Sequence, residues 1–150
     1  MSNAFLYRMG VGYAGQVTRL EVAKIEPQIL DSVNKPTVFG VPVIITSGKV
    51  CKFAGSGTIK GFLVRPYPTQ AEVSEALGAG TPNVNQMGDI LRSGYMIVDV
   101  QSGTAEKGGI VYANDTTGLV QADSAGATDT GAKFMGAADE NGIAEIEFNV

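Results

Sequence analysis

The sequence contains no histidine and no tryptophan, and it has one cysteine among 150 residues. Without histidine, every Ser-His-Asp or Cys-His catalytic arrangement and all imidazole ligation of metals are excluded. The commonest general base is therefore missing, which argues against an enzyme. The lone Cys51 cannot form an intrachain disulfide, so a disulfide-stapled fold is excluded as well. We interpret Cys51 as a structural thiol, because a nucleophilic cysteine needs an activating partner.

Charged residues are also scarce, at 17% of the chain, and the net charge is −4 with a pI of about 4.7. The Lys and Arg residues are scattered and form no run, so the composition argues against binding to nucleic acid or to an anionic membrane. No stretch approaches the roughly 18 apolar residues that span a bilayer, and the first 20 residues lack a signal-like apolar run. We therefore expect synthesis in the cytoplasm. We find no metal site, phosphate loop or nucleophile elbow, and we expect no cofactor.

What the chain does contain is 44% hydrophobic residues and 20 glycines, which suit one domain of many short strands. Its central stretch is Gly61–Val64, predicted to be a buried strand, followed by Arg65-Pro66-Tyr67-Pro68. The two prolines end the sheet ladder and stiffen an extended segment that carries a guanidinium and a phenol, two groups that protein surfaces use in contacts. The alternative is an ordinary surface loop.

A first hairpin is predicted where Ser47-Gly48 joins Val43–Thr46 to the strand Lys49–Phe53. Pro42 lies inside the mostly apolar stretch Val38–Thr46, and proline within a strand indicates an edge strand or a bulge rather than a central position.

A second hairpin is predicted at the end of the chain, where residues 139–142 connect the strands 133–137 and 143–150. In the last strand, Ile146 and Phe148 alternate with Glu145 and Glu147, so one face is apolar and the other polar. We interpret the two glutamates as a solvated sheet face.

Between the hairpins, Tyr95–Val100 is predicted to be a strand with Ile110–Tyr112 as its antiparallel neighbour. Residues 122–131 are small and polar and are predicted to form a surface loop. A capping box, Thr69-Gln70-Ala71-Glu72, predicts one short helix over Gln70–Leu77.

Near the start, Gly10-Val11-Gly12-Tyr13-Ala14-Gly15 matches G-x-G-x-x-G, a pattern typical of dinucleotide-binding sites. The β-branched residues that follow, and Pro27, argue against the helix that such a site requires, so we interpret the segment as a flexible glycine-rich arm. We predict an N-terminal arm over residues 1–16 and a β domain over residues 17–150.

The ordered set of segments resembles the structural cement, or capsid decoration, proteins of tailed bacteriophages. The resemblance lies in Phe5-Leu6-Tyr7-Arg8, Val17-Thr18-Arg19, Gly61 to Pro68, Leu91 to Met96, Lys107 to Tyr112 and Phe134 to Gly142. It implies an all-β, single-domain antiparallel β-sandwich of jelly-roll type. It also implies a non-enzymatic virion protein on the outer capsid surface, which binds the phage major capsid protein, cements neighbouring subunits and stabilises the expanded shell.

Within this interpretation, the expected capsid or subunit contacts are Phe5, Leu6, Tyr7, Arg8, Arg65, Tyr67 and Arg92. The apolar, β-prone Phe5–Arg8 would add to the sheet of a neighbour. Self-association is expected, with a homodimer favoured over a trimer. Two alternatives stay open. One is a carbohydrate- or host-binding β module of a phage tail or fibre, since jelly rolls also form lectins. The other is an enzyme subunit of the same β class.

Overall fold

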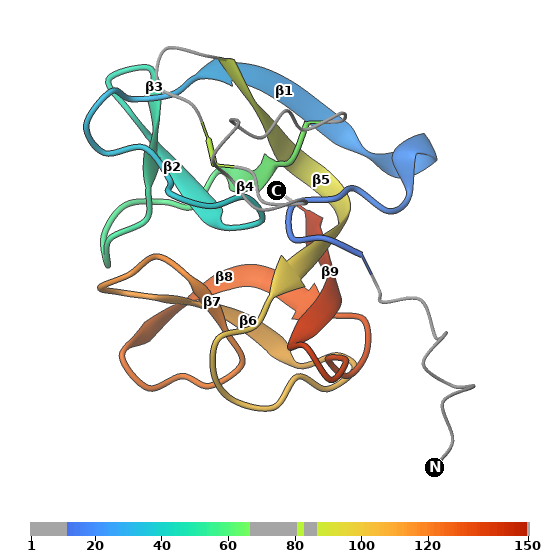
Figure 1. Cartoon of the computed structure of the whole chain (residues 1–150). Helices are drawn as coiled ribbons and strands as arrows, with labels where there is room; N and C mark the ends of the chain where they lie inside the picture. The colour runs from blue at the N-terminus through green and yellow to red at the C-terminus, as the bar shows by residue number, and fades with distance from the viewer. Residues whose placement is uncertain (1–11, 67–80, 83–86, 150) are drawn as a thin grey trace.

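The computed structural model describes residues 12–66, 81–82 and 87–149, and the regular structure in these ranges is almost entirely β-strand (Figure 1). Helical geometry is limited there to the 3-10 turn η2 (Leu20–Val22). The predicted helix Gln70–Leu77 lies outside the described residues. The strands are β1 (Lys24–Ile29), β2 (Pro42–Thr46), β3 (Lys49–Lys52), β4 (Gly61–Val64), β5 (Met87–Asp99), β6 (Ile110–Asn114), β7 (Val120–Gln121), β8 (Ala127–Phe134) and β9 (Ile143–Asn149).

In the described part of the chain the strands form one antiparallel sheet in the order β3-β2-β4-β5-β9-β8-β6-β7, with β1 also paired to β5. The first half of β5 pairs with β1 and β4, and its second half pairs with β9. The halves meet near Gly94, whose φ of +136° is a conformation that side-chain-bearing residues rarely adopt. The sheet curls on either side of β5, with β1–β4 in the upper part of Figure 1 and β6–β9 in the lower part. The predicted all-β, antiparallel, single-domain class is confirmed. The jelly-roll connectivity stays a prediction.

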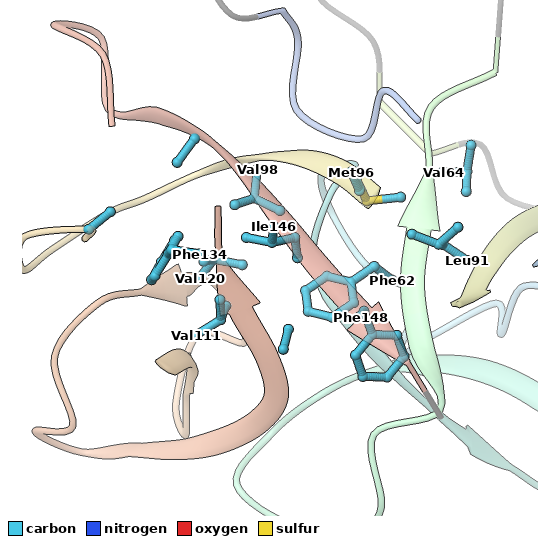
Figure 2. Close-up of a cluster of buried hydrophobic side chains, with 13 residues drawn as sticks. Phe62, Val64, Leu91, Met96, Val98, Val111, Val120, Phe134, Ile146 and Phe148 are labelled. Atoms are coloured by element: carbon cyan, nitrogen blue, oxygen red, sulfur yellow. The ribbon is translucent and has the colours of Figure 1, made fainter. Parts of the chain in front are cut away.

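Strand β4 is the centre of the molecule, and all four of its residues are buried. Because side chains alternate across a strand, Phe62 and Val64 pack into one apolar cluster while Leu63 packs into a second. The first cluster, shown in Figure 2, fills the curl of the sheet, and the ring of Phe62 meets the ring of Phe148 edge-on with 5.1 Å between centroids. The second cluster lies among β1–β5 and includes Ile90. The prediction of a buried strand at Gly61–Val64 is confirmed.

The β2–β3 hairpin forms as predicted, with Thr46 paired to Lys49 across a two-residue turn. Ser47 and Gly48 both have positive φ, 52° and 76°, which is the backbone of a type I′ turn. The prediction that Pro42 marks an edge or bulge is wrong, because β2 lies between β3 and β4. Pro42 is the first residue of β2, a position where a missing backbone donor is tolerated.

The last hairpin also forms, since β8 pairs with β9, and its turn is closed by the N–H of Gly142 donating to the carbonyl of Asp139. The predicted surface loop over 122–131 is wrong, because β8 begins at Ala127. Within β8, Thr130 and Ala132 are buried with Phe134, so small residues replace the large apolar ones that usually signal a strand.

The predicted pairing of Ile110–Tyr112 with Tyr95–Val100 is wrong as well. Strand β6 pairs with β7 and β8, whereas the second half of β5 pairs with β9.

Candidate interaction surface

Two of the predicted contact residues, Arg65 and Arg92, lie in the part of the chain that the structure describes. The other predicted contacts, Phe5, Leu6, Tyr7, Arg8 and Tyr67, lie outside the described residues. The geometry around the two arginines therefore provides the starting point for the site.

Arg65 follows β4 directly and joins that strand to the N-terminal segment. Its backbone N–H donates to the carbonyl of Gly15 at 2.8 Å, and the N–H of Gly15 donates to Ile97 on β5, also at 2.8 Å. The half-buried Arg65 side chain places its guanidinium carbon 5.1 Å from the centroid of the Tyr13 ring, a cation–π contact. Arg65 therefore contacts both Tyr13 and Gly15 at the end of β4.

The Gly15 backbone is held between two elements. A Cβ at this position would lie 2.7 Å from the Cβ of Phe39 and 2.9 Å from the backbone nitrogen of Arg65, and the φ of Gly15 is +90°. Residues 15–18 also bond to β5, with Ile97 donating to Gln16 and Thr18 donating to Tyr95. The described part of the glycine-rich segment thus packs against the sheet, which corrects its interpretation as flexible there.

A cleft of about 480 Å³ opens beside Arg65. Its lining combines apolar side chains of Val38 and Phe39 with the polar groups of Arg65, Asp99 and Gln101. The described residues contain no group of three His, Cys, Asp or Glu that could hold a metal ion.

Arg92 ties β5 to β1. Its Nη1 donates to Oε2 of Glu26 at 2.7 Å, and Glu26 also accepts a hydrogen bond from Gln28. The Nε of Arg92 is buried and has no hydrogen-bond partner in the structure. The charge of Arg92 is thus paired within the chain. Its role in binding a partner remains a prediction.

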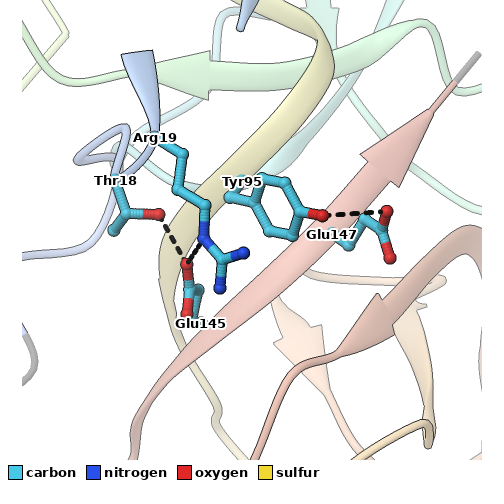
Figure 3. A network of polar contacts seen from close by, with 5 residues as sticks. All are labelled: Thr18, Arg19, Tyr95, Glu145 and Glu147. Atoms are coloured by element: carbon cyan, nitrogen blue, oxygen red, sulfur yellow. Dashed lines mark hydrogen bonds and ion pairs between the residues drawn. The ribbon is translucent and has the colours of Figure 1, made fainter. Parts of the chain in front are cut away.

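A polar network fastens residues 18–19 to the sheet, as Figure 3 shows. Oε1 of Glu145 accepts hydrogen bonds from the Thr18 hydroxyl at 2.7 Å and from Nε of Arg19 at 3.3 Å. The Arg19 guanidinium lies 4.0 Å from the centroid of the Tyr95 ring, and the Tyr95 hydroxyl donates to Glu147 at 3.3 Å. The two glutamates are therefore more than a solvated face. The sequence could not show this, because Thr18 and Glu145 are 127 residues apart.

A second feature that the sequence analysis missed is an apolar surface along β1. Five exposed large apolar side chains lie on η2, on β1 and at the start of β5, and we call this set the β1 strip: Leu20, Val22, Ile25, Ile29 and Met87. Leu20 is 71% exposed, Met87 64% and Ile29 54%. Ile29 and Met87 are adjacent because they pair directly, and exposed apolar residues that lie side by side are typical of interaction sites.

Charge is divided between the two parts of the molecule. Residues 24–66, which contain β1–β4, hold six basic and two acidic residues, whereas residues 100–149, which contain β6–β9, hold two basic and eight acidic residues. The protein therefore has a basic and an acidic part on either side of β5 (Figure 1). Such a distribution orients a protein as it approaches a charged surface.

An all-β body with exposed apolar side chains, a cleft beside an arginine and an uneven distribution of charge offers surfaces for contact with other proteins. The model of the XM1 gp53 minor capsid protein family matches residues 1–148, and the chain belongs to this family. The predicted membership of a phage capsid-associated family is thereby confirmed, and the protein is a structural component of a phage virion.

A solved structure supports the fold assignment. The chain is similar to a chain in the structure described as the capsid of Myoviridae phage XM1, with a TM-score of 0.72 and 21% sequence identity over 99% of this chain and 97% of that chain. No match was found among the curated proteins.

Proposed function

We propose that this capsid protein is a non-enzymatic cement protein, which binds the outer surface of the expanded icosahedral shell and links neighbouring major capsid subunits. The observation that carries the proposal is the family match, which extends over residues 1–148 and therefore includes the N-terminal segment as well as the β body. The same match favours a capsid role over the alternative of a carbohydrate- or host-binding module in a tail or fibre.

The N-terminal segment supports the linking role. The backbone bonds of Gly15 and the Glu145 network hold residues 15–19 on the sheet, so the preceding residues start from a defined point. The apolar, β-prone Phe5–Arg8 precedes this point by a few residues and can bind a neighbouring molecule. A body that is fixed at one place and a segment that binds at another can together span a joint between subunits.

The energetics of a shell allow each contact to be weak. A ligand that binds only the assembled, expanded state stabilises that state by mass action. The acidic net charge and the division of charge between the two parts also favour solubility before docking and a defined orientation on arrival. We further propose that the protein self-associates, as a dimer rather than a trimer, and contacts neither nucleic acid nor membrane.

Co-sedimentation with expanded, undecorated shells tests the proposal. The full-length protein should bind saturably, in a fixed ratio to the capsid subunits. A variant that lacks residues 1–9 should remain folded by circular dichroism and lose shell binding. Failure of the folded full-length protein to bind expanded shells would refute the cement role, and unchanged binding of the deletion variant would refute the role of the segment.

A further inference from the structure

Exposed apolar side chains are concentrated in one part of the molecule. Residues 100–149, which contain β6–β9, are all described, and Ile110, at 39% exposure, is the only exposed large apolar side chain among them. The other described residues carry eight such side chains, and Val33 is the most exposed of these at 82%. Burial of apolar surface drives most association between proteins, so the docking surface is to be sought outside β6–β9.

Val33 lies on a loop whose backbone is fixed by hydrogen bonds. The Asp31 carboxylate accepts from the backbone N–H groups of Val33 at 2.9 Å and of Asn34 at 2.7 Å. Before Val33, the N–H of Asp31 donates to the carbonyl of Val50 on β3 at 2.9 Å. After Val33, the carbonyl of Asn34 accepts from the N–H of Lys52 on β3 at 2.7 Å. The loop is thus ordered before it binds, which lowers the entropic cost of a contact through Val33.

Two lysines of β3, Lys49 and Lys52, adjoin this loop. Residues 29–52 hold three lysines and one acidic residue, Asp31, so this region carries a net positive charge. No lysine of the described residues takes part in an ion pair. A partner with complementary charge is therefore acidic.

Two further apolar side chains lie close to β3. Leu30 forms a bridge with Val50, so the preceding Ile29 and its strand partner Met87 lie next to this part of the sheet. Both are exposed. We call the combined set the β3 surface: Ile29, Val33, Lys49, Lys52 and Met87.

We propose that the β3 surface docks on an acidic region of the major capsid protein, with Val33 as the apolar anchor, an inference that rests on the proposed cement function. Lys49 and Lys52 then face carboxylates of the capsid. The exposed apolar side chains favour a protein partner over nucleic acid, where most contacts are polar bonds to phosphate. The same capsid carboxylates repel the acidic part that contains β6–β9, which therefore points away from the shell.

Lysine footprinting tests this orientation on the unaltered protein. All seven lysines lie in described residues, five of them in residues 24–60 and two, Lys107 and Lys133, in residues 100–149. The free and the shell-bound protein are briefly acetylated, and mass spectrometry measures the modification of each lysine. On shells, the modification of Lys49 and Lys52 should fall at least about fivefold, and that of the exposed Lys107 and Lys133 should change by less than about twofold.

Matched variants test the charged and the apolar contacts separately. The double variants Lys49→Gln/Lys52→Gln and Lys107→Gln/Lys133→Gln remove the same charge from the two parts, and only the first should weaken shell binding, by about threefold or more. Val33→Ser should weaken shell binding about tenfold, because it removes the apolar anchor. Val38→Ser is the control, since Val38 is also an exposed valine but lines the cleft beside Arg65. Circular dichroism checks that each variant is folded.

Each other outcome would overturn the inference. Protection of Lys107 and Lys133 in place of Lys49 and Lys52 would show the reverse orientation. Equal loss of binding in the two lysine variants would show that net charge alone matters. Protection of Lys49 that appears without shells and grows with protein concentration would show contact between copies. Shell binding of the wild-type protein is scored first, so saturable binding without the expected footprint refutes this surface and leaves the proposed function standing.

Discussion

Replacement of Gly15 by alanine should destabilise the protein far more than the same change at Gly108. Both glycines have positive φ, +90° and +81°, so alanine at either site costs about 1–2 kcal/mol of backbone strain. At Gly108 a Cβ would meet nothing within 4 Å, whereas at Gly15 it would lie 2.9 Å from the backbone nitrogen of Arg65. Backbone cannot move aside as a flexible side chain can, so overpacking adds about 1–3 kcal/mol.

The expected loss in unfolding free energy is therefore about 2–5 kcal/mol for Gly15→Ala and about 1–2 kcal/mol for Gly108→Ala. With a urea m-value of about 2 kcal/mol/M, the unfolding midpoint should fall by about 1–2.5 M and by about 0.5–1 M, respectively. Urea unfolding followed by circular dichroism measures both. Equal losses at the two sites would refute the reasoning, because they would show that the N-terminal segment does not pack closely between Phe39 and Arg65.

Two further predictions concern polar contacts. A double-mutant cycle of Arg19→Ala and Glu145→Ala measures how much this ion pair adds to the free energy of unfolding. We expect a coupling free energy of about 0.2–1 kcal/mol, because both side chains are partly exposed. A coupling free energy above about 2 kcal/mol would contradict this account. Hydrogen bonds from the backbone N–H groups of Asn34 and Val33 lower the pKa of Asp31 below 3.8. Because the pKa of Asp31 is lower in the folded than in the unfolded protein, the ionised Asp31 stabilises the fold above pH 3.8. This stabilisation is lost as the pH falls through the pKa of Asp31 in the folded protein. In the Asp31→Asn variant, the urea unfolding midpoint should therefore fall less steeply below about pH 4 than in the wild-type protein. An equally steep fall in both proteins would contradict this prediction.

The elements that could be predicted from the sequence are those whose signal is local. Ser47-Gly48 specifies a turn by its own conformational preferences, and Phe62 to Val64 form a run of apolar β-formers that must be buried. Strand β8 could not be predicted from the same kind of signal, because its buried positions include Thr130 and Ala132. The Thr130 hydroxyl donates to the carbonyl of Val111 at 2.7 Å, a partner that only the fold provides.

The candidate interaction surface was less predictable from the sequence than the fold. Arg65 was chosen because prolines follow it in the sequence, and in the structure it lies at a cleft and bonds to Gly15. The β1 strip was missed because the sequence does not show which face of β1 is exposed, and this becomes visible only in the folded sheet, where β1 pairs with β5. The Glu145 network was missed because it joins residues at opposite ends of the chain.

The central claim, that the protein cements the expanded shell, is tested most directly by the thermal stability of the shell itself. Expanded, undecorated shells are titrated with the purified protein, and their disruption temperature is followed by light scattering. The account predicts that this temperature rises with added protein and levels off at the ratio where binding saturates. Saturable binding with no rise in the disruption temperature would contradict the account.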